Sequence, residues 1–208
     1  AELIRSGKVA DCGNSLAPNV EKMLSLRAGA IFVAPFQNSG GYGKLGQAGI
    51  PVIECADYME VSPLARAEWM RFYGRLFGKG AEADSLYAVT AKEYNDLAKI
   101  GRGLATRPKV LTDKVYGQAW NVPGGKSTFG MLIEDAGGEN LFKKYDSSGS
   151  VPLAPEKVAV EAAKADVWLI RYNKKGGDMT MRELADENPL YKRLAPFGNG
   201  AVYGVNTD

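Results

Sequence analysis

The fold class is decided by residues 30–54, which read AIFVAPFQNSGGYGKLGQAGIPVIE. The run 30–34 is short and continuously apolar, which is typical of a strand buried on both faces. A glycine-rich loop at 37–43 and a short helix over 44–48 then lead to a second apolar run at 49–53. This order predicts a β-α-β unit with parallel strands, and therefore an α/β fold.

The segments around this unit continue the alternation of strands and helices. Ser62 and Pro63 are expected to begin a long helix that ends at Gly78, and a second long helix is expected over 81–100. Further strands are predicted at 109–112, 167–172 and 201–205, and further helices at 127–136, 155–165 and 180–187. Before the unit, we expect an extended segment at 9–10, a polar loop at 14–19 and a helix capped by Pro18 or Asn19.

This pattern predicts two α/β lobes joined by a helical hairpin. The expected boundaries are an N-terminal lobe at 1–61, a helical connector at 62–105 and a C-terminal lobe at 106–208. One weak internal similarity supports two lobes, because 18–22 and 155–158 each begin a helix with an acid in the first turn.

Composition excludes several classes of protein. The 208 residues are 45% hydrophobic and 24% charged, which is typical of globular chains and excludes disorder as the main state. The net charge of +2 is too small for a general nucleic-acid binder, so no nucleic-acid partner is expected. The chain has no histidine, which removes the usual general base and every histidine-dependent triad. No apolar run approaches the roughly 20 residues of a membrane-spanning helix.

The two cysteines and one glycine-rich motif do not indicate a metal site or a phosphate-binding loop. Cys12 and Cys55 are too few for a thiolate zinc site or an iron–sulfur cluster. They either pair in an oxidising compartment or remain two buried free thiols, and the sequence leaves both open. Residues 124–128 read GGKST, but Trp120 stands where a phosphate-binding loop needs glycine. We expect a turn there that leads to a helix capped by Ser127.

Candidate binding residues follow the predicted strands, because ligands of open α/β sheets bind outside the carboxyl ends of strands. Arg171 would supply a positive fork that suits an anion. Its expected companions at strand ends are aromatic rings and amides, namely Asn38, Tyr42, Tyr116, Trp120, Tyr172 and Asn173. The alternatives are an ordinary surface turn for the loop at 37–43 and core packing for Trp120.

Two acids occupy equivalent places in the two halves. Glu21 and Glu156 each lie in the first turn of a predicted helix, where the helix dipole favours a carboxylate. The dipole alone explains either residue. Their recurrence in both halves suggests a shared external role.

Four segments carry a resemblance to a known family. They read GIPVIECADYME at 49–60, SPLARAEW at 62–69, VPGGKS at 122–127 and EDAGG at 134–138. In order and spacing the chain resembles the periplasmic substrate-binding proteins of ABC importers for iron complexes, a class that also includes vitamin B12-binding and haem-binding members. The resemblance runs over nearly the whole chain.

The resemblance implies a class III fold, in which two Rossmann-like lobes joined by a long rigid helix hold a metal chelate between them. The implied protein is a receptor and not an enzyme, with no cofactor and no metal ligands of its own. It would bind a ferric siderophore or a similar metal chelate and deliver it to an ABC transporter permease. Glu21 and Glu156 would dock on the permease, and the protein would be periplasmic, with a lipid anchor in the full-length form as one option.

The family pattern also implies that this sequence lacks two segments that family members carry. Family members carry an additional β-α-β stretch before this sequence begins and a long final helix after it ends. We therefore expect a fragment or a trimmed mature form whose first lobe is incomplete. An exposed sheet edge would follow, and pairing of two chains through that edge is a further expectation.

Two rival functions remain open at this point. One is a metal-dependent or chelatase-like enzyme on a doubly wound α/β scaffold, with Asp57, Glu60 and Arg171 as its site. The other is a structural surface module whose cleft is empty. Turnover of a substrate would favour the enzyme, and saturable binding of a ferric chelate without product would favour the receptor.

Overall fold

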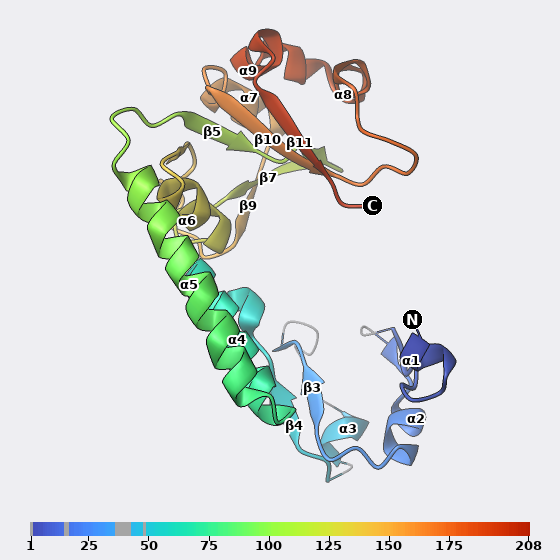
Figure 1. Ribbon diagram of the computed structural model, residues 1–208. Helices are drawn as coiled ribbons and strands as arrows, with labels where there is room; N and C mark the ends of the chain where they lie inside the picture. The colour runs from blue at the N-terminus through green and yellow to red at the C-terminus, as the bar shows by residue number, and fades with distance from the viewer. Residues whose placement is uncertain (1, 15–16, 36–42, 48) are drawn as a thin grey trace. The chain divides into compact units, whose positions relative to one another are not determined.

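The computed structural model describes residues 2–14, 17–35, 43–47 and 49–208 (Figure 1). Contacts between residues divide the chain into a first unit, Ala1–Asp57, and a second unit, Tyr58–Asp208. The two long helices of the expected connector belong to the second unit by these contacts. The three-part division of the chain stays a prediction.

The first unit contains a small parallel sheet. Strand β3 (Ile31–Val33) pairs with β4 (Val52–Glu54), and a short helix α3 (Lys44–Gln47) precedes β4. The β-α-β order predicted from residues 30–54 is therefore present, with shorter strands. The other described elements are α1 (Glu2–Arg5), β1 (Gly13–Asn14), β2 (Ala17–Pro18), α2 (Val20–Ser25) and, at the border of the units, the 3₁₀-helix η2 (Asp57–Met59).

The segment before β3 differs from the prediction. Residues 9–10 form no strand, and the predicted loop at 14–19 overlaps the short antiparallel pair β1–β2. A hydrogen bond from the Asn19 backbone N–H to the Cys12 carbonyl oxygen (2.7 Å) closes this narrow hairpin. The Asn19 side chain also caps α2 by accepting from the Lys22 backbone N–H, which decides between the two predicted caps.

Two long helices open the second unit. Helix α4 (Pro63–Leu76) begins as predicted, with Ser62 as its N-cap and proline at the first position. Helix α5 (Gly80–Arg102) is slightly longer than expected at both ends.

Helix α5 crosses α6 (Thr128–Asp135) at Gly101. A Cβ atom at Gly101 would lie 2.3 Å from the Asp135 carbonyl oxygen, so only glycine permits this approach. The Tyr94 hydroxyl donates to the Asp135 carboxylate (2.7 Å), and Arg102 pairs with the same carboxylate. This crossing ties α5 to the sheet domain of the second unit.

The main sheet of the second unit is fully parallel, in the order β11-β10-β5-β8. Its strands are β5 (Lys109–Thr112), β8 (Glu139–Asn140), β10 (Val167–Tyr172) and β11 (Val202–Asn206). The chain runs outward from β5 to β8 and then returns to place β10 on the other side of β5. The strand order therefore reverses between β5 and β10, which is the topological switch point of a doubly wound sheet.

Four short helical elements follow in this part of the chain: α7 (Pro155–Glu161), α8 (Met181–Glu187), the 3₁₀-helix η3 (Pro189–Arg193) and α9 (Ala195–Asn199). Thr180 caps α8 through a reciprocal pair of hydrogen bonds with Glu183. Helix α7 ends at Glu161, four residues before the predicted end at 165. The chain then turns toward β5, where the Asp166 carboxylate accepts from the Lys109 backbone N–H (2.7 Å). Strand β10 begins at the next residue.

A second sheet in this unit was not predicted. Strands β6 (Val115–Tyr116), β7 (Ala119–Pro123) and β9 (Ser150–Leu153) form an antiparallel sheet in the order β6-β7-β9. Glycine and proline residues within and beside these strands make the sequence read as loop. The local signal was the alternation in β7, where Trp120 and Val122 are buried and Asn121 is exposed.

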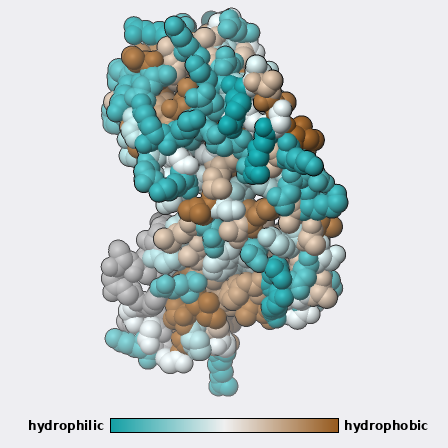
Figure 2. Space-filling model, turned by 90° about the vertical axis from the view of Figure 1, so that its left-hand side faces the viewer, coloured by the Kyte–Doolittle hydropathy of each residue, from teal (hydrophilic) through white to brown (hydrophobic). Residues whose placement is uncertain are grey.

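The core of the second unit is built around three aromatic rings. Trp120, Trp168 and Tyr191 are at most 1% exposed, and the rings of Trp168 and Tyr191 meet edge-on with centroids 4.9 Å apart. On the face shown in Figure 2, hydrophilic side chains cover most of the upper part, which holds the four-stranded sheet and its helices.

The helices and the two cysteines bear on the expectations from composition. Among the described residues, none of the helices is both long enough and apolar enough to cross a membrane. Cys12 and Cys55 are free thiols, and only Cys55 is buried.

The tight crossing at Gly101 generates a prediction about stability. Gly101→Ala should lower the free energy of unfolding, because the new methyl group overlaps the backbone of residues 135–137. Overpacking of this kind costs about 1–3 kcal/mol. Gly103→Ala is the matched control, because a Cβ there meets nothing closer than 3.4 Å. Urea unfolding measures both, and equal stability of the two variants would contradict the prediction.

Candidate functional site

The switch point of the parallel sheet brings together a carboxylate and a guanidinium. Asp113 directly follows β5, and Arg171 lies near the carboxyl end of β10. The Asp113 backbone N–H donates to the Leu169 carbonyl oxygen (2.8 Å), which extends the pairing of these two strands to the sheet edge. In doubly wound sheets, ligands bind at this edge and at this point.

The backbone at Asp113 is held by two buried tryptophans. Trp120 Nε1 donates to the Thr112 carbonyl oxygen (3.0 Å), and Trp168 Nε1 donates to the Asp113 carbonyl oxygen (2.7 Å). Asp113 itself has a φ of 57°, in the left-handed region that aspartate tolerates better than most residues. The core therefore fixes the turn from which this carboxylate projects.

Arg171 is oriented by two partners. Its Nε and Nη2 atoms donate to the two carboxylate oxygens of Asp113 at 2.9 and 3.0 Å. Its guanidinium carbon lies 5.1 Å from the centroid of the Phe129 ring at the start of α6. The hydrogen bonds that Arg171 donates to Asp113 raise the pKa of the guanidinium above its ordinary value, so it stays charged.

This pair lines a pocket of about 240 Å³. The other lining residues come from the segment after β5 and from the antiparallel sheet: Lys114, Val115, Tyr116, Asn121 and Ser150. Tyr116 is 85% exposed, so its ring is available to a ligand. Lys114 is paired with Glu187 on α8 (2.6 Å).

The position of Tyr116 depends on Tyr191. The Val115 backbone N–H donates to the buried Tyr191 hydroxyl (2.9 Å), which anchors the two-residue strand β6 to the core. Burial raises the pKa of Tyr191 to about 12, and the Val115 N–H opposes this rise. The neutral tyrosine is therefore the form that supports this strand.

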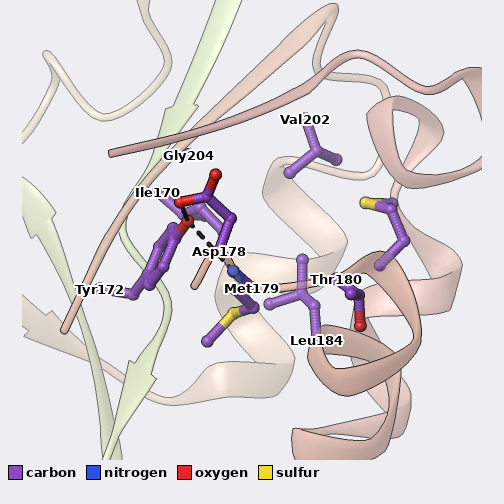
Figure 3. A pocket seen from close by; sticks show the side chains of 9 residues that line it. Ile170, Tyr172, Asp178, Met179, Thr180, Leu184, Val202 and Gly204 are labelled. Atoms are coloured by element: carbon purple, nitrogen blue, oxygen red, sulfur yellow. Dashed lines mark hydrogen bonds between the residues drawn. The ribbon is translucent and has the colours of Figure 1, made fainter. Parts of the chain in front are cut away.

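The predicted site residues divide between two faces of the sheet. Arg171 and Tyr116 line the same pocket, as their places at strand ends suggested. Tyr172 points to the opposite face, because successive residues of a strand alternate. There its hydroxyl donates to Asp178 (3.1 Å) and accepts from the Met179 backbone N–H (3.1 Å), in a separate pocket that Leu184 and Val202 also line (Figure 3).

Trp120 requires a correction. Its side chain has no exposed surface, so it cannot form a wall against a ligand in this structure. It acts from behind the site by holding the end of β5, which agrees with the alternative of core packing. Asn173 is exposed but lines neither pocket. Asn38 and Tyr42 lie outside the described residues, so their roles stay predictions.

Glu21 and Glu156 are both exposed, each in the first turn of its helix, α2 and α7. No ion pair is found for either carboxylate within the described parts of the chain. Glu156 also lines a wide pocket of about 520 Å³ with Gln118 and Asn188.

The rival metal site finds no support in the geometry. The Glu60 carboxylate accepts from Trp69 Nε1 (2.9 Å), and the Glu60 backbone carbonyl oxygen accepts from the Thr128 hydroxyl. Glu60 therefore links α4 to the start of α6. Across the residues that the structure describes, no group of three or more histidine, cysteine or acidic side chains is arranged to hold a metal ion.

Ser127 caps α6 as predicted, and its Oγ accepts from the Gly130 backbone N–H.

The sequence reasoning missed Asp113, Asn121 and Ser150, which line this pocket, and Phe129, whose ring packs against Arg171. Asp113 carried a usable signal, because it directly follows a predicted buried strand. Asn121 and Ser150 belong to the sheet that was not predicted. Phe129 reaches Arg171 only through the packing of α6.

Residues 2–207 match a family model described as periplasmic binding protein. An uncharacterized lipoprotein of Methanocaldococcus jannaschii is 26% identical over 209 residues, which cover 99% of this chain and 49% of that protein. The chain spans about half the length of this relative and of a second uncharacterized lipoprotein of the same organism, to which it is 25% identical.

Solved structures share the fold. The Fe³⁺–Desferal-bound siderophore binding protein FhuD from Vibrio cholerae has a TM-score of 0.71 at 19% identity, covering 95% of this chain and 73% of that chain. The catecholate-siderophore binding protein VctP from Vibrio cholerae has a TM-score of 0.71 at 16% identity, with 99% and 74% covered. At these identities the likeness shows the fold alone.

The anchoring of β6 by Tyr191 generates a prediction. Tyr191→Phe should lower the free energy of unfolding by about 1–3 kcal/mol, because the Val115 N–H loses its acceptor. Because burial raises the pKa of Tyr191 to about 12, the buried neutral tyrosine also gives the wild type a stabilisation that is complete below about pH 10 and is lost as the pH rises toward 12. Denaturant unfolding at both ends of this range measures it.

Tyr203→Phe is the control, because that tyrosine is 60% exposed on β11. If wild type and Tyr191→Phe lost equal stability between pH 10 and pH 12, the assigned role of Tyr191 would be wrong.

Proposed function

The chain belongs to the periplasmic binding protein family, and on this premise we propose that it is a receptor for a ferric siderophore or a related metal chelate. The receptor performs no chemistry on its ligand. It delivers the chelate to an ABC transporter permease.

The observation that carries this proposal is the pocket at the switch point of the parallel sheet. An oriented guanidinium, Arg171, and an exposed aromatic ring, Tyr116, line the same pocket. A chelate offers oxygen acceptors for the first and an apolar organic surface for the second. Asn121 and Ser150 add neutral hydrogen-bonding groups at the rim.

The nature of the ligand is supported by two similar structures, which are described as siderophore-binding proteins. We extend that class of ligand to this chain. Because the chain has no histidine, haem would need tyrosine or methionine as its iron ligand, which favours a siderophore complex whose iron needs no protein ligand.

We also propose an extracytoplasmic location. The family is named for periplasmic proteins, and a relative that matches 99% of this chain is named a lipoprotein. A lipid anchor on the full-length protein would keep the receptor near its permease. Pairing of two chains through a sheet edge stays a prediction without further support.

Ligand binding is tested by titrating the purified protein with a panel of ferric siderophores and haemin while tryptophan fluorescence is recorded. We expect saturable, stoichiometric quenching by at least one ferric siderophore. Arg171→Ala should weaken that binding at least tenfold, which corresponds to about 1.4 kcal/mol. Arg182→Ala, an exposed arginine on α8, is the matched control and should bind as wild type does.

A lack of saturable binding across the panel would contradict the proposal, as would conversion of any chelate to a new product. Native mass spectrometry of protein recovered from its source should show a retained metal complex.

Glu21 and Glu156 are proposed to dock on the permease, because both are exposed at helix starts, one in each unit. The double variant Glu21→Ala/Glu156→Ala should bind the chelate normally but associate at least tenfold more weakly with the permease reconstituted in nanodiscs. The control is Glu2→Ala/Glu93→Ala, which also removes one exposed acid from each unit. Equal permease association by both double variants would refute the docking role.

A further inference from the structure

The cations that line the switch-point pocket are already neutralised by the protein. Arg171 is bound by both carboxylate oxygens of Asp113, and Lys114 is paired with Glu187. These three, Asp113, Lys114 and Arg171, are the charged side chains among the residues that line the pocket. With Glu187 included, two positive charges meet two negative charges, so the pocket presents no excess charge.

The hydrogen-bonding groups that remain for a ligand are mostly neutral. Arg171 donates to Asp113 through Nε and Nη2. Its third nitrogen, Nη1, has no hydrogen-bond acceptor among the described residues. The amide of Asn121 and the hydroxyls of Tyr116 and Ser150 are likewise without partners within the described chain. A neutral oxygen acceptor on the ligand can bind Nη1 without disturbing the Asp113–Arg171 pair.

A ligand with several negative charges meets a different surface. Asp113 lines the pocket and its side chain is 22% exposed, so its carboxylate repels an anion there. To use the whole guanidinium, a polyanion must displace Asp113, which leaves that carboxylate without its partner. The pair is a poor stabiliser of the fold, because Arg171 is 61% exposed and such ion pairs contribute little. Its main effect is on the charge that the pocket presents.

We infer that Asp113 is a specificity-determining residue that selects metal chelates of zero or low net charge with neutral oxygen acceptors, and rejects polyanionic chelates. This inference rests on the proposed function. The two similar solved structures do not decide it, because one binds Fe³⁺–Desferal and the other is named for catecholate siderophores. The pocket's own side chains carry the distinction.

The test compares two hexadentate iron(III) complexes: ferrichrome, a neutral tris-hydroxamate, and ferric enterobactin, a trianionic tris-catecholate. Dissociation constants are measured for wild type and Asp113→Asn by tryptophan quenching. Wild type should prefer the neutral complex at least tenfold. Asp113→Asn should reduce that preference at least tenfold, because it removes the repelling charge and frees the guanidinium.

The matched control is Asp96→Asn, which also removes one acid from an ion pair but lies on α5, away from the pocket. Its preference between the complexes should equal that of wild type. Asparagine tolerates the left-handed backbone of residue 113, and Asp113→Gly takes its place if thermal melting shows that the asparagine variant is unfolded.

The outcomes separate the two claims. Equal or tighter binding of the trianion by wild type, or an unchanged preference in Asp113→Asn, would overturn the inference and leave the receptor function standing. Binding of neither complex by wild type or variant would overturn the receptor function for siderophores, and the inference would fall with it.

Discussion

Two indole N–H groups hold the candidate site in place by donating to consecutive carbonyl oxygens at the end of β5. Trp120 binds the carbonyl of Thr112 and Trp168 binds that of Asp113, and both indoles are buried. A buried carbonyl without a donor costs about 1–3 kcal/mol, so these contacts strongly favour one path for the chain as it leaves the sheet. That path places the Asp113 carboxylate against Arg171. The hydrophobic core therefore sets the geometry of a polar pocket through two side-chain hydrogen bonds.

Local patterns were sufficient for the strands that meet at the switch point. The bounds of β5 and β10 are those predicted from short apolar runs, and Ser62, Ser127 and Thr180 cap their helices as predicted. These features depend on neighbouring residues alone. The antiparallel sheet was missed because Gly117 and Pro123 interrupt its pattern, and its pairing joins β7 to a strand almost thirty residues later.

The candidate site was partly predictable for the same reason. Arg171 and Tyr116 were assigned from their places at strand ends, and the structure puts both in one pocket. Trp120 was predicted to contact the ligand because an aromatic residue near a strand end is compatible both with the rim of a binding site and with the hydrophobic core. Its burial depends on Trp168 and Tyr191, which are distant in the sequence. No local pattern could show that Asp113 occupies the guanidinium of Arg171.

The left-handed backbone at residue 113 has an evolutionary consequence. Few residues occupy that conformation without strain, and aspartate, asparagine and glycine are among them. Exchange within this small set changes the formal charge next to Arg171 while the backbone and the two indole hydrogen bonds can remain as they are. Under the specificity role proposed for Asp113, lineages that share this scaffold would diverge in the cargo they carry by single-residue replacement, without first acquiring compensating changes in the interior.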